Sequence, residues 1–184
     1  MNENNLKTKK LINFGPSGRA VAQPMDNSLL ENFFEHLTME RFANVQYFSI
    51  YLWFQERDLH GFSEYFLNES KSEMEHAQKF ANYLVARGQN VKLKSLPAPV
   101  QNWDSIEDLI SYSFNMETDL TASLQQLYSI SERIFDTRTN VFLDPIVEVQ
   151  TKSEDEFAHI LGKVRFANNQ PSAILLIDSD LKRK

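Results

Sequence analysis

Residues 59–83 of the chain read LHGFSEYFLNESKSEMEHAQKFANY. The large apolar side chains of this stretch recur at alternating steps of three and four residues, which is the period of one buried helix face. Near the middle of that face the apolar residues give way to Glu69, Glu73 and His76. An isolated buried carboxylate must be paired, protonated or bound to a metal. The stretch therefore predicts an amphipathic helix with a polar site inside a helical core.

Three further segments show the same periodicity, so we expect four long helices. They cover about residues 27–56, 62–87, 105–135 and 140–167, and a short fifth helix covers about residues 172–181. Residues 88–103 contain Pro97 and Pro99, which exclude a helix there. The connections are therefore short, long and short. This order predicts an all-α four-helix bundle with one long crossover connection.

Capping and turn residues mark the ends of these helices. Residues 26–28 (Asp-Asn-Ser) are N-cap candidates for the first helix. Asp104 is the expected cap of the third helix, with Glu107 as its capping-box partner. A tight turn is expected at residues 136–139. Pro145 then falls in the first turns of the fourth helix, where proline is best tolerated.

The composition of the 184-residue chain narrows the possible functions. There is no cysteine, which excludes disulfides, thiolate zinc sites and iron–sulfur clusters. The net charge of -6 disfavours a nucleic-acid or anionic-membrane partner and is compatible with a cationic ligand. No apolar run reaches the roughly 18 residues of a membrane span, and no signal-peptide region develops. We therefore expect a cytoplasmic protein with one core, preceded by an irregular tail at residues 1–25.

Polar residues interrupt the apolar stripe of each predicted long helix near its middle. Glu40 does so in the first helix, Glu117 in the third and Gln150 in the fourth. Together with Glu73 and His76 they should converge at one height of the bundle. No Lys or Arg lies in the stripes to neutralise the carboxylates, and Glu73 and His76 share one helix face. A hard or borderline metal cation is the simplest way to hold these groups together.

At these positions the chain resembles the ferritin family. The segment from Glu40 to Tyr47 resembles the first-helix motif, in which a metal-binding Glu is followed seven residues later by a Tyr. Residues 73–76 (Glu-Met-Glu-His) resemble the second-helix Glu-x-x-His motif. Glu117 and Gln150 stand at the third-helix ligand position and the fourth-helix Gln position of ferritins. The resemblance covers roughly residues 27–181.

The resemblance implies an iron storage protein with a ferritin-like di-iron domain at residues 26–184. Its subunits would form a twenty-four-subunit homo-oligomeric cage, with Fe²⁺ and O₂ as partners. Each subunit would oxidise Fe²⁺ at an internal ferroxidase centre, and the cage would store the ferric mineral. Residues 142–145 (Phe-Leu-Asp-Pro) look like non-haem prokaryotic and algal ferritins, cyanobacterial ones in particular. No haem is expected.

The resemblance also implies catalytic and metal-binding roles for single residues. Glu40, Glu73 and His76 would form the first iron site. Glu73, as a bridge, and Glu117 would form the second. Gln150 would lie near the irons or bind one weakly.

Two further residues near this centre have implied roles. Tyr47 would give an electron or a hydrogen bond during oxygen reduction. Glu69 resembles a glutamate that some ferritins use as a third iron site or transit ligand. That role is weakened because Ser72 and Ser153 replace acidic residues of related sequences.

Asp144 and Glu148 are four residues apart on the predicted fourth helix. They resemble the acidic lining of the three-fold ion channel in ferritin cages. A solvated acidic face is the alternative interpretation.

A second Glu-x-x-His, Glu156-Phe-Ala-His159, keeps an alternative open. Bacterioferritins and several di-iron oxidases or peroxidases carry such a pair in the fourth helix, in place of the Gln. Here the pair lies six residues after Gln150 and off the apolar stripe, so Gln150 is the favoured fourth-helix residue.

Overall fold

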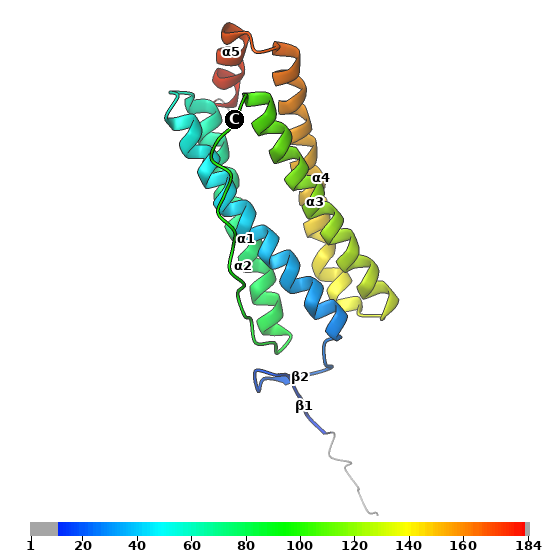
Figure 1. Cartoon of the computed structure of the whole chain (residues 1–184). Coiled ribbons are helices and arrows are strands. Elements are labelled where there is room, and N and C mark those ends of the chain that lie inside the picture. Colours follow the sequence, from blue (N-terminus) through cyan, green and yellow to red (C-terminus); the bar gives the residue numbers. More distant parts are fainter. Residues whose placement is uncertain (1–10, 183–184) are drawn as a thin grey trace, which may run out of the picture.

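The computed structural model describes residues 11–182 and is mainly helical (Figure 1). The elements are β1 (Asn13–Phe14), β2 (Ala20–Val21), α1 (Asn27–Gln55), α2 (His60–Ala86), α3 (Ile106–Arg133), α4 (Thr137–Ala167) and α5 (Pro171–Leu181). Helix α1 packs along α2, and α3 packs along α4. The short α5 lies across one end of the bundle and contacts α2 and α4. The predicted four-helix bundle with a short fifth helix is therefore confirmed.

The long connection between α2 and α3 runs along the α1–α2 pair from one end of the bundle to the other (Figure 1). The fully buried Gln46 of α1 holds it at Val100. The Gln46 side chain donates to the Val100 carbonyl and accepts from the Val100 N–H, at 2.8 Å each. Arg41, also on α1, donates to the carbonyl of Lys94 at 2.9 Å. These contacts satisfy backbone groups that a non-helical segment would otherwise leave unpaired.

The interior of the bundle contains two hydrophobic clusters. One contains Phe54, Phe66 and Phe157 and lies toward the end that α5 covers. The other contains Phe33 and Phe80 and lies toward the opposite end. The buried polar residues that interrupt the stripes lie between these clusters, as the sequence pattern predicted.

Helix α5 approaches the start of α2 closely. A Cβ atom at Gly61 would lie 1.7 Å from the carbonyl oxygen of Asp178, so only glycine fits there. The Asp178 carboxylate accepts a hydrogen bond of 2.9 Å from the N–H of Phe62, one of the unpaired donors in the first turn of α2.

Two predicted helix starts are wrong, those of α3 and α4. Ser105, not Asp104, caps α3, because Ser105 is extended and its hydroxyl accepts from the N–H of Asp108 at 3.0 Å. The predicted turn at 136–139 lies inside the start of α4. The chain reverses one residue before the predicted turn, at Phe135, which adopts a left-handed φ of 58°. Pro145 therefore lies well inside α4 instead of in its first turns.

Part of the predicted irregular tail has regular structure. Strands β1 and β2 pair antiparallel, with Asn13 opposite Val21. The turn between them packs against Gly88, where the N–H of Ser17 donates to the Gly88 carbonyl at 3.1 Å. A Cβ atom at Gly15 would lie 2.4 Å from the same carbonyl oxygen. Residues 1–10 of the predicted tail lie outside the described residues. Within residues 11–182, none of the helices is both long and apolar enough to cross a membrane.

Candidate metal centre

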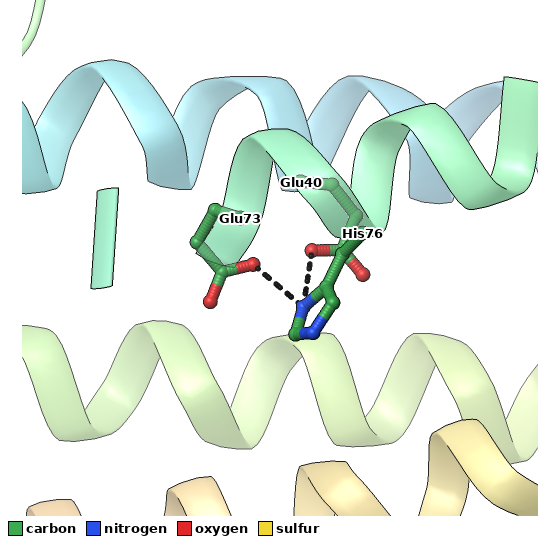
Figure 2. A group of neighbouring side chains, drawn as sticks. All are labelled: Glu40, Glu73 and His76. Atoms are coloured by element: carbon green, nitrogen blue, oxygen red, sulfur yellow. Dashed lines mark hydrogen bonds and ion pairs between the residues drawn. The ribbon is translucent and has the colours of Figure 1, made fainter. Parts of the chain in front are cut away.

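Helices α1 and α2 bring three potential metal ligands together in the middle of the bundle (Figure 2). Glu40 comes from α1, and Glu73 and His76 come from one face of α2. One ligand atom of each lies within 4.8 Å of the others, and all three residues are buried. His76 Nδ1 lies 3.3 Å from Glu73 Oε2 and 3.8 Å from Glu40 Oε2. This arrangement fits a single cation held by two carboxylates and one imidazole.

Helices α3 and α4 add the buried Glu117 and Gln150 on the opposite side of the core. The Tyr47 hydroxyl donates to Glu117 Oε1. The Gln150 amide donates to Glu117 Oε2 at 2.8 Å and to the Glu117 carbonyl at 3.1 Å. Both Glu117 oxygens therefore have protein partners. Glu117 is not part of the three-residue ligand group, although the charge of Glu73 acts on it.

Burial shifts the protonation of the carboxylates in this region. Burial is the main factor that raises the pKa of Glu73 to about 8 and of Glu117 to about 7, with repulsion from neighbouring carboxylates added. It also raises the pKa of Glu40. Burial lowers the pKa of His76, but the adjacent Glu73 and Glu40 outweigh it, so the net shift is upward.

The ion pairs formed between residues 11 and 182 include none from Lys or Arg to Glu40, Glu73 or Glu117. The described part of the chain therefore collects buried carboxylates that have no Lys or Arg partner. A bound cation would supply the positive charge, and the donor set of oxygen and imidazole nitrogen suits hard or borderline ions.

Glu69 extends the acidic region along α2 but lies outside the ligand group. Burial raises its pKa to about 8, and Glu117, Glu73 and Glu156 add to the shift. The neighbouring Tyr65 hydroxyl is buried and has no hydrogen-bond partner among the residues that the structure describes.

The remaining predicted residues lie apart from the ligand group. His159 is exposed on α4. Asp144 and Glu148 are also exposed: the Tyr128 hydroxyl donates to Asp144 at 2.8 Å, and Lys152 pairs with Glu148 at 2.7 Å. The channel interpretation of Asp144 and Glu148 stays a prediction, because a three-fold channel is formed by several subunits.

Sequence reasoning missed His36, which is fully buried on α1. Its Nε2 lies 2.9 Å from Glu40 Oε1, and its Nδ1 lies 2.9 Å from the Ser123 hydroxyl of α3. Burial lowers the pKa of His36 to about 3, so the ring is neutral near pH 7. The available signal was its spacing of four residues before Glu40, which places both side chains on one helix face.

A pocket of about 250 Å³ between α2 and α4 reaches His76. Its other lining residues are Lys79, Phe80, Phe142, Pro145, Ile146 and Val149. The pocket connects the edge of the metal centre with the surface of the bundle.

A four-helix bundle with buried carboxylates and a Glu-x-x-His histidine on facing helices defines the class of carboxylate metal proteins with a ferritin-like fold. The model of the ferritin-like domain matches residues 30–167, three quarters of the chain. The chain belongs to the ferritin family.

Individual relatives agree with this assignment. A ferritin of the crayfish Pacifastacus leniusculus is 27% identical over 154 residues, covering 82% of this chain and 85% of that protein. The bacterial non-heme ferritin of Staphylococcus aureus is 24% identical over 157 residues, covering 85% of this chain and 95% of that protein.

Solved structures share the fold. An open-pore ferritin of the archaeon Archaeoglobus fulgidus superposes with a TM-score of 0.84 at 24% identity, covering 88% of this chain and 99% of that one. A variant of the protein PmFTN, soaked in iron, superposes with a TM-score of 0.80 at 31% identity, covering 84% and 98%.

Proposed function

We propose that this protein is a non-haem ferritin that oxidises Fe²⁺ with O₂ and stores the ferric product. The observation that carries the proposal is the buried group of Glu40, Glu73 and His76, in which neither carboxylate has a Lys or Arg ion pair among the described residues. Membership of the ferritin family and the similarity to a bacterial non-heme ferritin support iron as the ion.

Two Fe²⁺ ions are the substrates in this proposal. Glu40, Glu73 and His76 bind the first ion, and Glu73 also bridges to the second. Binding requires ionised carboxylates and a neutral imidazole Nδ1, so Fe²⁺ displaces protons from groups whose pKa burial has raised. Glu117 binds the second ion, and Gln150 and Tyr47 hold Glu117 in position until it does so.

A pair of Fe²⁺ ions supplies two electrons, which with two protons reduce O₂ to hydrogen peroxide. Reduction to water takes two more electrons, one of which a further Fe²⁺ ion supplies. Tyr47 is suited to supply a further electron and proton, because its hydroxyl donates to Glu117 and is completely buried. Glu69, one turn from Glu73 on α2, is suited to pass iron to or from the centre.

The proposal includes a twenty-four-subunit cage in the cytoplasm, with Asp144 and Glu148 lining the three-fold entry channels. A pore with carboxylates from three subunits attracts Fe²⁺ electrostatically. Asp144→Ala should then slow iron arrival and reduce its dependence on salt, whereas Asp155→Ala, at another exposed acid of α4, should not. Equal rates for all three proteins at every salt concentration would place the entry route elsewhere.

The alternative di-iron oxidase or bacterioferritin-like site needs a fourth-helix histidine at the centre. The exposure of His159 and the contact between Gln150 and Glu117 favour the ferritin arrangement. Iron bound to His159 Nε2 or Nδ1 in an iron-loaded crystal would favour the alternative.

The test of the proposed function is Glu73→Ala, which removes the shared ligand of both ions. The fast phase of Fe²⁺ oxidation should disappear, and the absorbance change after mixing with aerobic Fe²⁺ measures it. The assembly should stay intact, as judged by size-exclusion chromatography. Glu75→Ala, which changes an exposed acid on the same helix, is the matched control and should oxidise iron at the wild-type rate. Rapid oxidation by Glu73→Ala would contradict the assignment.

A further inference from the structure

His36 is a buried side chain to which the proposed mechanism gives no role. It lies one turn before Glu40 on α1, and its ring packs 4.4 Å from the ring of Phe80. It links Ser123 of α3, at 2.9 Å from Nδ1, to Glu40, at 2.9 Å from Nε2. A polar ring at this depth is costly to bury unless both nitrogens are satisfied.

The contact between His36 and Glu40 is close but is not a complete hydrogen bond. Although His36 Nε2 and Glu40 Oε1 lie within hydrogen-bonding distance, their alignment falls short of a hydrogen bond. Both Nε2 and the other carboxylate oxygen, Glu40 Oε2, therefore lack a hydrogen-bond partner among the described residues. The terminal torsion of a glutamate is soft, so a small rotation of the Glu40 carboxylate aligns the contact.

The chemistry of the three groups fixes the direction of the hydrogen bonds. When Glu40 binds a cation its carboxylate is ionised and only accepts, so the proton of the neutral His36 ring must then lie on Nε2. His36 Nδ1 then accepts, and the Ser123 hydroxyl, which can do either, donates to it. The chain of donors runs from Ser123 through His36 to Glu40.

We propose that His36, held by Ser123, is a positioning residue that pins Glu40 Oε1 and so presents Glu40 Oε2 to the metal ion. Oε2 is the oxygen nearer to His76 Nδ1, at 3.8 Å. Glu40 thereby binds through one oxygen in a fixed direction. The inference rests on the proposed function, because it assigns a partner to one of the proposed ligands. Histidine here supports a carboxylate ligand, the reverse of the frequent arrangement in which a carboxylate supports a histidine ligand.

The experiment measures binding of Co²⁺, whose visible spectrum reports the geometry of its ligands. Assembled protein is titrated with Co²⁺, and the signal of Glu73→Ala is subtracted to remove ions bound elsewhere. His36→Leu should weaken the remaining site by about 10–100-fold, the range for loss of a group that orients a ligand. It should also change the spectrum of the bound ion.

Conservative variants separate positioning from packing. His36→Gln can donate to Glu40 and accept from Ser123, so it should recover most of the affinity and the wild-type spectrum. Ser123→Ala should weaken binding by less than His36→Leu does. Ser113→Ala, which removes another buried hydroxyl of α3 away from Glu40, should bind as wild type.

The outcomes distinguish the two proposals. If wild type and Glu73→Ala bind Co²⁺ identically, the buried site itself is absent and both proposals fail. If wild type binds Co²⁺ at the site and His36→Leu matches its affinity and spectrum, only the role of His36 fails. A crystal soaked in Zn²⁺ in which His36 Nε2 coordinates the ion would also overturn that role, because His36 would then be a ligand.

Discussion

Two buried polar clusters of this bundle are built in opposite ways. At the end of the α3–α4 turn, Arg87 donates to Asp136 at 2.6 Å, to Tyr83 at 2.6 Å and to Thr139 at 3.0 Å. Burial raises the pKa of Asp136, but the Arg87 partner outweighs it and the net shift is downward. The cluster around Glu73 instead collects carboxylates whose pKa values are raised.

The difference lies in where the countercharge comes from. The Arg87 cluster contains its own cation and fixes the junction of α2 with α4, since Asp136 is also the N-cap of α4. The Glu73 cluster contains no such cation and must stay partly protonated or take an ion from solution. In this chain the cluster with its own cation joins two helices, whereas the cluster without one is the candidate metal centre.

The largest expected effect comes from breaking the complete cluster. Arg87→Leu leaves Asp136 buried without its partner and should lower the free energy of unfolding by about 3 kcal/mol. Denaturant unfolding of the metal-free protein measures this. The double variant with Asp136→Asn keeps a capping side chain, removes the stranded charge and should recover part of the loss. A loss below about 1 kcal/mol for the single variant would mean that the pair adds little.

The second prediction concerns pH. Glu69 and Glu73 have a pKa of about 8 and Glu117 of about 7 in the fold, above the usual 4.5. The unfolded chain therefore binds fewer protons between pH 7 and 9, and the stability of the metal-free protein should fall as pH rises through that window. The lowered pKa of Asp136 acts only in acid, where its contribution is lost as pH falls.

Thermal unfolding at pH 7, 8 and 9 checks this dependence. Saturating Zn²⁺ should flatten the dependence, because bound carboxylates are already ionised. A melting temperature of the metal-free protein that is constant over this range would show that the carboxylates are not buried as described.

A smaller effect is expected from relieving the incomplete cluster. Glu73→Gln replaces a buried carboxyl group, which is costly to ionise, by a neutral amide of the same shape, and should stabilise the metal-free protein by about 1 kcal/mol. The same variant should lose the stabilisation that Zn²⁺ gives to wild type. Denaturant unfolding with and without Zn²⁺ measures both. A metal-free variant less stable than wild type would mean that Glu73 is satisfied without an ion.

The smallest effect on stability is expected for Tyr47→Phe. The ring keeps its stacking on Phe157, with ring centroids 5.5 Å apart, and only the bond to Glu117 is lost. We expect a loss of about 0.5 kcal/mol. Fe²⁺ binding should be unchanged, while the later steps of O₂ reduction slow or change product. Stopped-flow kinetics that match wild type at every iron loading would mean that Tyr47 only packs in the core.

Sequence periodicity was enough to predict the helices and a buried polar layer, whereas the grouping of Glu40, Glu73 and His76 in one site was implied by the resemblance to ferritins. Glu40, Glu73 and His76 each interrupt an apolar stripe, so burial of all three followed from the helical period alone. His36 was missed because it lies beside Phe33 and Leu37 at the edge of the stripe, and its depth depends on how closely α3 packs. The contact with Ser123 joins residues 87 positions apart, which no local pattern reports.

The remaining errors have one long-range cause and two local ones. The β1–β2 pair forms where Gly15 meets Gly88, a contact across the first two helices. Pro145 is tolerated inside α4 because both it and Val141, whose carbonyl it leaves unpaired, are exposed to water. Ser105 and Asp104 are both good capping residues, and backbone geometry chose between them.

The position of the polar layer between two hydrophobic clusters also has a consequence for the cooperativity of unfolding. Without an ion, repulsion across this layer weakens the coupling between the two clusters, which favours local opening of one end while the other stays folded. An ion that joins Glu40 of α1 to Glu73 and His76 of α2 ties both clusters to one point. Amide hydrogen exchange of the metal-free protein would then separate into two groups of rates, one for each end, and merge toward one global rate when the ion binds.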